Sequence, residues 1–352
     1  MDLKEISVSL PKWAKDLGFQ QIAITDINLK QYEPYYIDWL KKGFNGSMSY
    51  LTRNSDKRLA PDKLEIGTCR VISARMNYLY QGVQPVQVLE NPSNGYIARY
   101  ALGRDYHKVM RTRLAKLAKK IDEATDTEGN YRAFADSAPI LEKPLGEKAG
   151  LGWIGKNGLL LDKNEGSWFF LGEIYTNLPL PVSDKQSSNE CGRCEACINN
   201  CPTNAILDNK QIDARKCISY MTIESRDPIP VNFRELIGNR IFGCDDCQIY
   251  CPANHPSTTT KESDFAPRHQ LDSPDLLELF SWSEKTFTEK TRGSAIRRIN
   301  YAQWKRNLAV ALGNGKRTQQ TLAALESSRD NAPDLAKEHI DWAIGRLRQK
   351  PI

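Results

Sequence analysis

The chain has 352 residues, of which 40% are hydrophobic and 26% charged, and a formal net charge of +6. At roughly 150 residues per domain this length predicts two or three domains, and the composition excludes a disordered chain, a collagen-like repeat and a small disulfide-stapled scaffold. No apolar run approaches the roughly 20 residues of a membrane span. The N-terminus, MDLKEISVSL, has acidic residues where a signal peptide needs a basic start. We therefore expect a cytoplasmic protein with no membrane association.

The first 178 residues alternate between helical and extended patterns. Residues 3–17 and 105–124 predict amphipathic helices, the second with its apolar positions on one face. The expected strands cover residues 21–25, 70–74, 131–135, 159–162 and 167–175, with the last two joined by 163–166 as a hairpin. This alternation predicts an α/β domain over residues 1–178.

The remainder of the chain predicts two further parts. A proline-rich and then polar stretch follows residue 177, and a cysteine-rich domain is expected over 179–262. Residues 263–352 read as helical, with amphipathic helices over 299–312 and 335–347 that resemble the end of an α-solenoid. The last sixty residues carry twelve Lys and Arg against five Asp and Glu, which is the whole positive excess. This charge predicts either a polyanionic partner or a solvated helix surface.

Eight of the nine cysteines lie within a segment of about sixty residues. Their first run, Cys191-x-x-Cys194-x-x-Cys197-x-x-x-Cys201-Pro, matches the ferredoxin pattern, in which three thiolates hold one four-iron cluster and the fourth crosses to another. This rule divides the cysteines into two sets of four: Cys191, Cys194, Cys197 with Cys251, and Cys201, Cys217, Cys244 with Cys247. The alternative is a pair of zinc sites, but zinc explains neither the third in-step cysteine nor the two Cys-Pro endings. We predict two four-iron four-sulfur clusters.

Three further motifs have less specific patterns. Gly150-x-Gly-x-x-Gly155 spells a dinucleotide fingerprint, but neither a strand before it nor a helix after it is expected. His107 comes two residues after Asp105, as in histidine-ligated cobalamin enzymes, but it lies within an expected helix and is read as an exposed side chain after a capping aspartate. Asp136, before Ser-Ala-Pro, is read from local sequence as the N-cap of a short helix.

Taken together, these segments are similar to one family. Asp136-Ser-Ala-Pro, Glu142, the run from Ala149 to Asn157, the first cysteine run, Arg215-x-Cys-Ile-Ser-Tyr220 and the segment from Gly238 to Cys247 all match it. The chain resembles the epoxyqueuosine reductases, which use cobalamin and iron–sulfur clusters in the last step of queuosine synthesis in tRNA. The resemblance runs from about residue 10 to the C-terminus. It implies an α/β cobalamin-binding domain, a ferredoxin-like two-cluster domain and a HEAT-like helical segment, the last one shorter than in some members.

The resemblance also implies roles for particular residues. Asp136 corresponds to the proton donor of the family. The residues that fall where family members approach the corrin are Arg58, Arg99, Asp136, Leu160, Leu171, Ser219, Cys244 and Asp245. Cobalamin follows from the resemblance only, whereas the clusters follow from the cysteine spacing.

The function expected from this resemblance is reduction of epoxyqueuosine to queuosine at the wobble position of tRNA with a GUN anticodon. The expected partners are that tRNA, held by the basic C-terminal helices, and a flavodoxin- or ferredoxin-type electron donor; the protein is expected to be a monomer. Two alternatives belong to other classes. One is a corrinoid iron–sulfur reductive dehalogenase, which usually has an export signal and lacks a basic helical tail. The other is an electron carrier without a corrin.

Overall fold

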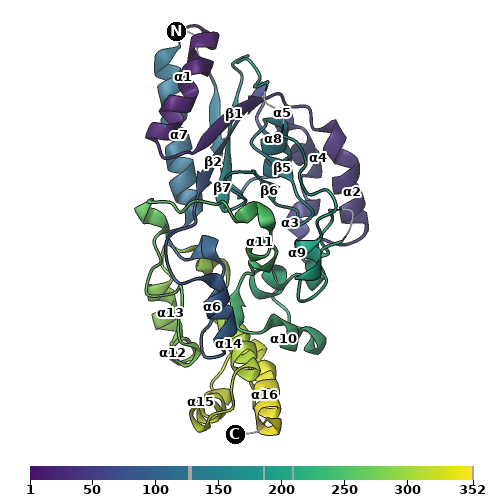
Figure 1. Ribbon diagram of the computed structural model, residues 1–352, viewed down its shortest axis with the longest axis vertical. Coiled ribbons are helices and arrows are strands. Elements are labelled where there is room, and N and C mark those ends of the chain that lie inside the picture. The colour runs from purple at the N-terminus through teal and green to yellow at the C-terminus, as the bar shows by residue number, and fades with distance from the viewer. Residues whose placement is uncertain (126–128, 185–186, 208–209, 351–352) are drawn as a thin grey trace.

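The computed structural model describes residues 1–125, 129–184, 187–207 and 210–350. Its N-terminal half is built on a four-stranded sheet in which every neighbouring pair is antiparallel, in the order β1-β2-β7-β4 (Figure 1). The strands are β1 (Gln21–Thr25), β2 (Arg70–Asn77), β7 (Phe169–Thr176) and β4 (Tyr131–Phe134). The alternation of side chains along β7 determines which of its residues face which layer of helices.

Helices cover both faces of this sheet. On one face α1 (Leu3–Asp16) and α7 (Tyr106–Ala124) lie side by side, and the apolar face expected for residues 105–124 is buried there (Figure 1). On the other face α8 (Glu142–Lys148) packs through Leu145 against Val71 and Tyr175 of the sheet. The smaller helices of this half are α2 (Glu33–Lys41), α3 (Ser49–Thr52), α4 (Ser55–Leu59), α5 (Pro61–Leu64) and α6 (Pro85–Glu90). The predicted α/β architecture is confirmed.

The predicted hairpin over 159–175 is wrong. β6 (Leu160–Leu161) pairs with β5 (Trp153–Ile154) in a separate two-stranded sheet, whereas β7 pairs with β2 and β4. Asp162 and Gly166 form a single antiparallel bridge at the turn, so the chain reverses there without forming a hairpin sheet. The cause lies at Gly152, where any added Cβ would clash with the Leu161 carbonyl oxygen. The glycine-rich turn thus brings its own strand against β6, and β7 is free to join the large sheet.

The cysteine-bearing segment consists of short elements below the sheet. They are α9 (Ala196–Asn199), α10 (Val231–Ile237), β8 (Arg240–Phe242) and α11 (Asp246–Ile249). β8 pairs in parallel with β3 (Tyr96–Ile97), so a segment from the N-terminal half reaches into this region.

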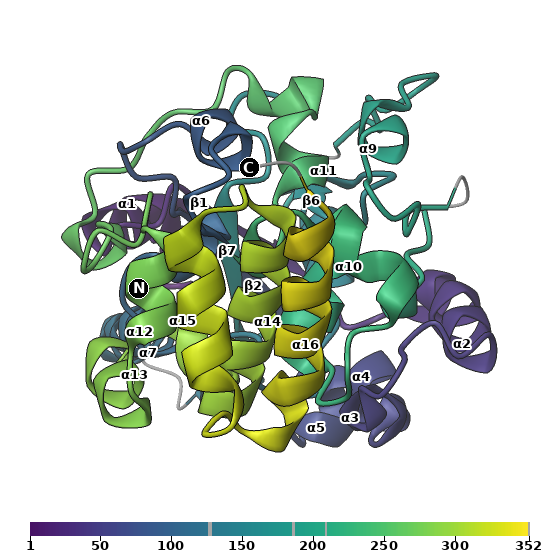
Figure 2. The same cartoon turned by 90° about the horizontal axis from the view of Figure 1, so that it is seen from below.

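The C-terminal helices form a layered group at the far end of the molecule (Figures 1 and 2). They are α12 (Leu276–Ser281), α13 (Glu284–Lys290), α14 (Tyr301–Asn314), α15 (Gln319–Arg329) and α16 (Asp334–Gln349). Figure 2 shows α14, α15 and α16 side by side, which confirms a HEAT-like helical end. Their core also contains Ile97, Leu102 and Phe242, and the domain boundaries at 178 and 262 stay a prediction. None of the helices described is long and apolar enough to cross a membrane.

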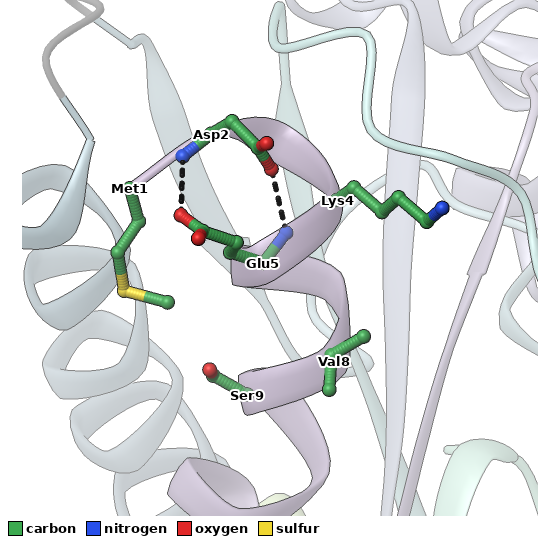
Figure 3. A pocket seen from close by; sticks show the side chains of 6 residues that line it. All are labelled: Met1, Asp2, Lys4, Glu5, Val8 and Ser9. Atoms are coloured by element: carbon green, nitrogen blue, oxygen red, sulfur yellow. Dashed lines mark hydrogen bonds between the residues drawn. The ribbon is translucent and has the colours of Figure 1, made fainter.

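A surface hollow at the start of α1 is shown in Figure 3. Asp2 caps the helix by accepting from the Glu5 N–H, and Glu5 accepts from the Asp2 N–H in return. Val8, on the next turn, has 76% of its surface exposed. The hollow is lined entirely by residues 1–9, and none of the site residues predicted above contributes to it.

Candidate active site and cluster-binding segment

The two cysteine runs, about fifty residues apart in the chain, lie next to each other in space. Cys197 is on α9 and Cys247 on α11, and these two single-turn helices are in contact. Asn157, just after the glycine-rich turn, donates from Nδ2 to the Cys247 carbonyl at 3.1 Å. The segment that spelled a dinucleotide fingerprint therefore supports the cluster-binding segment; a helix, α8, precedes it where a dinucleotide site needs a strand.

Thiols within each predicted set lie close enough to act on one another's pKa, and Cys197 also acts on Cys247 across the two sets. Burial, followed by the charges of Cys251, Cys191 and Cys194, raises the pKa of Cys197 to about 11. Burial and then the charge of Cys217 raise the pKa of the Cys247 thiol. Cys201 likewise acts on the pKa of Cys217, behind burial and two backbone N–H groups that lower it. Binding to iron would convert these buried thiols into the thiolates that clusters require.

The arrangement does not suit a single ion at either set. Among the residues that the structure describes, no three His, Cys, Asp or Glu side chains converge closely enough to share one metal ion. A structural zinc site requires four ligands around one ion, whereas each thiolate of a four-iron cluster binds a different iron. The cysteine spacing, with its third in-step cysteine and two Cys-Pro endings, favours clusters over the zinc alternative. Cys194 is exposed, so the first set lies at the surface.

Asp136 does not cap a helix, and that interpretation of the sequence is wrong. The residue follows β4 with a φ of 55°, a left-handed conformation, and the next helix begins only at Glu142 after Leu141. Aspartate tolerates this region better than most residues, but the conformation still needs support from its surroundings. That support comes from the Glu142 carboxylate, whose Oε1 accepts from the Asp136 N–H at 2.5 Å.

The Asp136 carboxylate is the centre of a hydrogen-bond network. Tyr106 donates from its hydroxyl to Asp136 Oδ2 at 2.6 Å, and His107 Nε2 lies 3.2 Å from the same oxygen. His107 Nδ1 lies 2.7 Å from Asp105 Oδ1, and Asp105 caps α7 as expected. The Asp136 side chain keeps 57% of its surface open to solvent. A carboxylate that accepts hydrogen bonds on one side and is open to solvent on the other can contact a ligand.

The network determines how protons are shared at this site. Burial acts to lower the pKa of His107, but its hydrogen bonds to Asp105 and Asp136 raise that pKa to about 9. For Asp136 burial acts to raise the pKa, and the hydrogen bonds from His107 and Tyr106 outweigh it, so that the pKa lies below its usual value. At neutral pH the pair is therefore an imidazolium and a carboxylate with one proton between them. The expectation of an exposed His107 is wrong, because the side chain is half-buried between Asp105 and Asp136.

The residues expected near a corrin are placed in two groups. Arg58 donates to the Ile140 carbonyl at 3.3 Å and to the Tyr50 carbonyl at 3.4 Å, beside the Asp136 loop. The Asp245 carboxylate accepts from the Arg99 N–H at 2.7 Å, which joins the α/β half to the cysteine segment. Leu160 and Leu171 lie together over Gly146.

The remaining two lie on the cluster side. The Cys244 thiol is 2.7 Å from Asp246 Oδ2, and the Ser219 N–H faces the Cys217 thiol at the start of a π-helical turn, Tyr220–Glu224. Such turns are frequent at functional sites. None of the hydrogen bonds found for Ser219 among the described residues reaches Asp136 or the two arginines.

Two buried arginines test whether these residues fit cobalamin. Arg58 and Arg99 are each 7% exposed, and the Nε of each has no hydrogen-bond partner among the described residues. The Arg58 Nη atoms donate to backbone carbonyls, and the charge of Arg99 acts on the neighbouring Asp245 carboxylate. A buried N–H donor without an acceptor is unfavourable, so the two Nε groups are suited to the amide and phosphate oxygens that cobalamin carries. The residues present at this site therefore fit cobalamin.

Several residues of the site were not found from the sequence. Tyr106, Tyr50 and Arg298 come near Asp136 only through the fold; the Arg298 guanidinium lies 5.5 Å from the centre of the Tyr50 ring. Glu173 did carry a signal, because it is the one charged residue in the apolar run 168–175. The fold places it beside Glu142.

The chain matches two family models. One, "Epoxyqueuosine reductase QueG, DUF1730", matches residues 58–137, and the other, "4Fe-4S double cluster binding domain", matches residues 190–254. The second match includes the whole cysteine segment and confirms the predicted pair of iron–sulfur clusters. The first match, to the epoxyqueuosine reductase model, ends one residue after Asp136.

Curated relatives match over almost the whole chain. The epoxyqueuosine reductase of Aliivibrio fischeri is 52% identical and covers 98% of this chain and 92% of its own length. The enzyme of that name from Escherichia coli is 50% identical, with coverages of 98% and 90%.

Solved structures of epoxyqueuosine reductases have the same fold as this chain. Epoxyqueuosine reductase from Streptococcus thermophilus superimposes with a TM-score of 0.89 at 28% identity, covering 99% of this chain and 92% of that one. An epoxyqueuosine reductase with an epoxyqueuosine-modified tRNA-Tyr stem loop has the same fold, with a TM-score of 0.84 at 23% identity and coverages of 99% and 100%. From the relatives' identity and coverage, the chain belongs to the epoxyqueuosine reductase family.

Proposed function

We propose that this protein reduces epoxyqueuosine to queuosine at the wobble position of tRNA with a GUN anticodon. The observation that carries the proposal is the Asp136 site, an open carboxylate that shares a proton with His107 and lies in a chain with a two-cluster domain. Membership of the family and the relative with a bound tRNA stem loop support the substrate. The two alternatives are not favoured: an electron carrier has no use for a proton-donating site, and a dehalogenase has none for the basic hollow described below.

The reaction requires two electrons and two protons, because the epoxide oxygen leaves as water and a carbon–carbon double bond remains. The clusters supply electrons singly, and cobalamin, when bound, supplies a strongly reducing and nucleophilic metal centre. We assign Arg58 and Arg99 to its polar groups, and Leu160, Leu171, Ser219, Cys244 and Asp245 to its surroundings.

The proposed role of Asp136 is to transfer a proton to the substrate. In the resting protein the carboxylate is ionised, and the transferable proton is held on His107 Nε2, 3.2 Å away. As negative charge develops on the departing oxygen, Asp136 Oδ2 can transfer that proton to it. The hydroxyl of Tyr106 holds the carboxylate in position through its hydrogen bond. A positioned acid of this kind contributes about 10²–10⁴-fold in rate.

Fewer basic residues of the C-terminal helices are available to contact tRNA than the net charge of this segment suggested. Lys305 and Arg306 are buried and donate to carbonyl oxygens inside the core, and Arg329 pairs with Asp341. Near the site, Arg226, Arg297 and Arg298 line a hollow of 320 Å³ together with Glu284. The Arg298 guanidinium also pairs with Glu224 at 2.8 Å. The charge of Arg298 also lowers the pKa of Asp136, behind burial and the contacts with His107 and Tyr106. We assign this hollow to a backbone phosphate near the wobble base.

Partners and location follow from this function. A substrate tRNA is found in the cytosol, so we place the protein there, as a monomer with residues 1–178, 179–262 and 263–352 as its three domains. Cys194 is the exposed ligand of the first set, and we assign the surface around it to a flavodoxin- or ferredoxin-type donor.

The test is a reaction with the purified protein. Anaerobically reconstituted protein with iron, sulfide, cobalamin and a chemical reductant is given tRNA that carries epoxyqueuosine, and the nucleosides are analysed by mass spectrometry. Formation of queuosine supports the proposal. Its absence from a preparation with full clusters and bound corrin, together with dehalogenation of an aryl halide, would favour the dehalogenase alternative. Clusters without bound corrin in the absorption spectrum would favour the carrier.

A further inference from the structure

A fully buried carboxyl group lies behind the Asp136 loop. Glu173 is in the middle of β7, opposite Ser73 of β2 and Phe134 of β4, and its exposed fraction is 0%. Neither of its carboxyl oxygens accepts a hydrogen bond from any donor among the described residues. An ionised carboxylate in such surroundings is highly unfavourable, so the group must be neutral or share a proton.

The polar neighbour of Glu173 is a second carboxyl group. Glu142, the first residue of α8, lies within hydrogen-bonding reach of it, and that contact is a hydrogen bond only when one of the two carries a proton. Burial and then the charge of Glu142 raise the pKa of Glu173 well above its usual value. Burial and then the charge of Asp136 raise the pKa of Glu142 above its usual value. Two adjacent carboxyl groups lose their protons in steps that belong to the pair.

Glu142 connects this pair to the site. Its Oε1 accepts the Asp136 N–H, which holds the left-handed turn that presents the Asp136 side chain. We propose that Glu142 and Glu173 share one proton and act as positioning residues, which together hold the Asp136 loop in its presenting conformation. The inference rests on the proposed role of Asp136 and adds to it the means by which that residue is held.

The shared proton gives each carboxyl group a distinct task. With the proton on Glu173, that residue donates to Glu142, and Glu142 stays an anion that accepts strongly from the Asp136 N–H. When the pair loses its proton, two adjacent negative charges repel each other and the contact with Asp136 is weakened. Four other titratable groups face the pair. Lys143 and His107 favour the ionised form of Glu142. Asp136 and Tyr175 can become negatively charged but not positively charged, so neither can neutralise the charge of the ionised pair. The loop should therefore be released at alkaline pH.

The decisive variants are Glu173→Gln and Glu142→Ala, tested in the holoenzyme by single-turnover reduction across pH. The amide of Glu173→Gln can still donate to Glu142 but cannot become charged. Its rate at neutral pH should stay within about threefold of wild type. The alkaline fall caused by loss of the shared proton should disappear, which leaves the fall caused by His107 near pH 9. Glu142→Ala removes the acceptor and should slow the reaction by about 10²-fold, the usual effect of a small misplacement, with tRNA affinity unchanged.

A matched control lies on the same helix. Glu147 also accepts a backbone N–H, that of Ile154 at 2.7 Å, but it supports the glycine-rich turn and has no contact with Asp136. Glu147→Gln should leave the rate and its pH dependence unchanged. Infrared spectroscopy provides a readout apart from activity. The carbonyl band of the carboxylic acid that carries the shared proton should disappear from wild type over the same pH range as the alkaline fall in rate, and should be missing in Glu173→Gln.

Two results would overturn the inference: an alkaline fall at the same pH in Glu173→Gln as in wild type, or a wild-type rate in Glu142→Ala. These failures are distinct from failure of the proposed role of Asp136. If Asp136→Asn turns over normally, that role is wrong, whatever the infrared band shows. If Asp136→Asn is inactive while Glu142→Ala is normal, only the positioning role is wrong.

Discussion

The cluster-binding segment and the Asp136 site are held in place by different forces. The cysteines lie on helices of four residues, α9 and α11, and on the loops around them. Asp136 instead follows a strand of the large sheet and is contacted by α7, a helix of 19 residues with a buried apolar face. Single-turn helices are not stable alone, so thiolate–iron bonds must supply in the first region what packing supplies in the second. The first region should depend on its cofactor for its structure, and the second only for its function.

The largest expected effect comes from removing a cluster ligand. Cys194→Ala should lower the iron content from about eight to about four per chain and abolish most turnover. Hydrogen exchange should quicken around residues 190–201 while β7 stays protected, because only the first region depends on iron. The control is Cys69→Ala, the cysteine outside the segment, which should keep full iron. Loss of protection in both regions alike would contradict the comparison, and stoichiometric zinc without labile sulfide would contradict the clusters.

The second effect is confined to chemistry. Asp136→Asn tolerates the same left-handed backbone but cannot carry the proton, so we expect a rate loss of about 10²–10⁴-fold. Iron content and corrin binding should match wild type and the fold should be retained, because packing holds this site. The measurement is single-turnover reduction with chemically reduced enzyme. A rate close to wild type would remove Asp136 from the reaction.

A smaller effect is expected at the basic hollow. Charge reversal of Arg297 and Arg298 should weaken tRNA binding and reduce the salt dependence, by about 0.7–0.9 in log–log slope for each phosphate that the protein no longer binds. The control is charge reversal of Arg329 and Arg348, which pair with Asp341 and Glu326 on the far helices. Equally weakened binding in both double variants would mean that the whole tail acts through its charge, without a specific phosphate site.

The smallest effect concerns pH and two histidines. His107 should titrate near pH 9, and His339, which burial keeps neutral and which accepts the Ile229 N–H, near pH 4. Because the folded pKa of His107 is raised, its contribution to stability is present below pH 6.5 and is lost as the pH rises through 9. For His339 the sign is opposite, and stability falls as the pH decreases from 6.5 towards 4. NMR titration of the imidazole signals checks both; a His107 pKa near 6.5 would mean that the hydrogen bond with Asp136 is absent in solution.

The two regions also differ in what a sequence can reveal. The cluster-binding cysteines could be predicted because the pattern depends on the spacing of cysteines close together in the sequence, as in Cys191-x-x-Cys194. No other site requires that pattern. The helices over 3–17 and 105–124 were predictable for the same reason, since one apolar face identifies each.

The rest depends on contacts between distant segments. Local sequence favoured a cap at Asp136, and only the neighbouring Glu142 and the distant Tyr106 show why its backbone is left-handed. Lys305 and Arg306 were counted as surface charge, but they reach carbonyl groups between helices that periodicity cannot place relative to each other. Residues 159–175 failed as a hairpin because a glycine upstream admits a competing strand.

The central claim is that this protein removes the epoxide oxygen of epoxyqueuosine in tRNA through Asp136. Its most direct test is mass spectrometry of the nucleosides in tRNA from cells that lack the protein, complemented by the wild-type chain or by Asp136→Asn. The account predicts accumulation of epoxyqueuosine without the protein, queuosine with the wild-type chain, and epoxyqueuosine again with Asp136→Asn. Normal queuosine in cells that lack the protein, with no other enzyme supplying the activity, would contradict it.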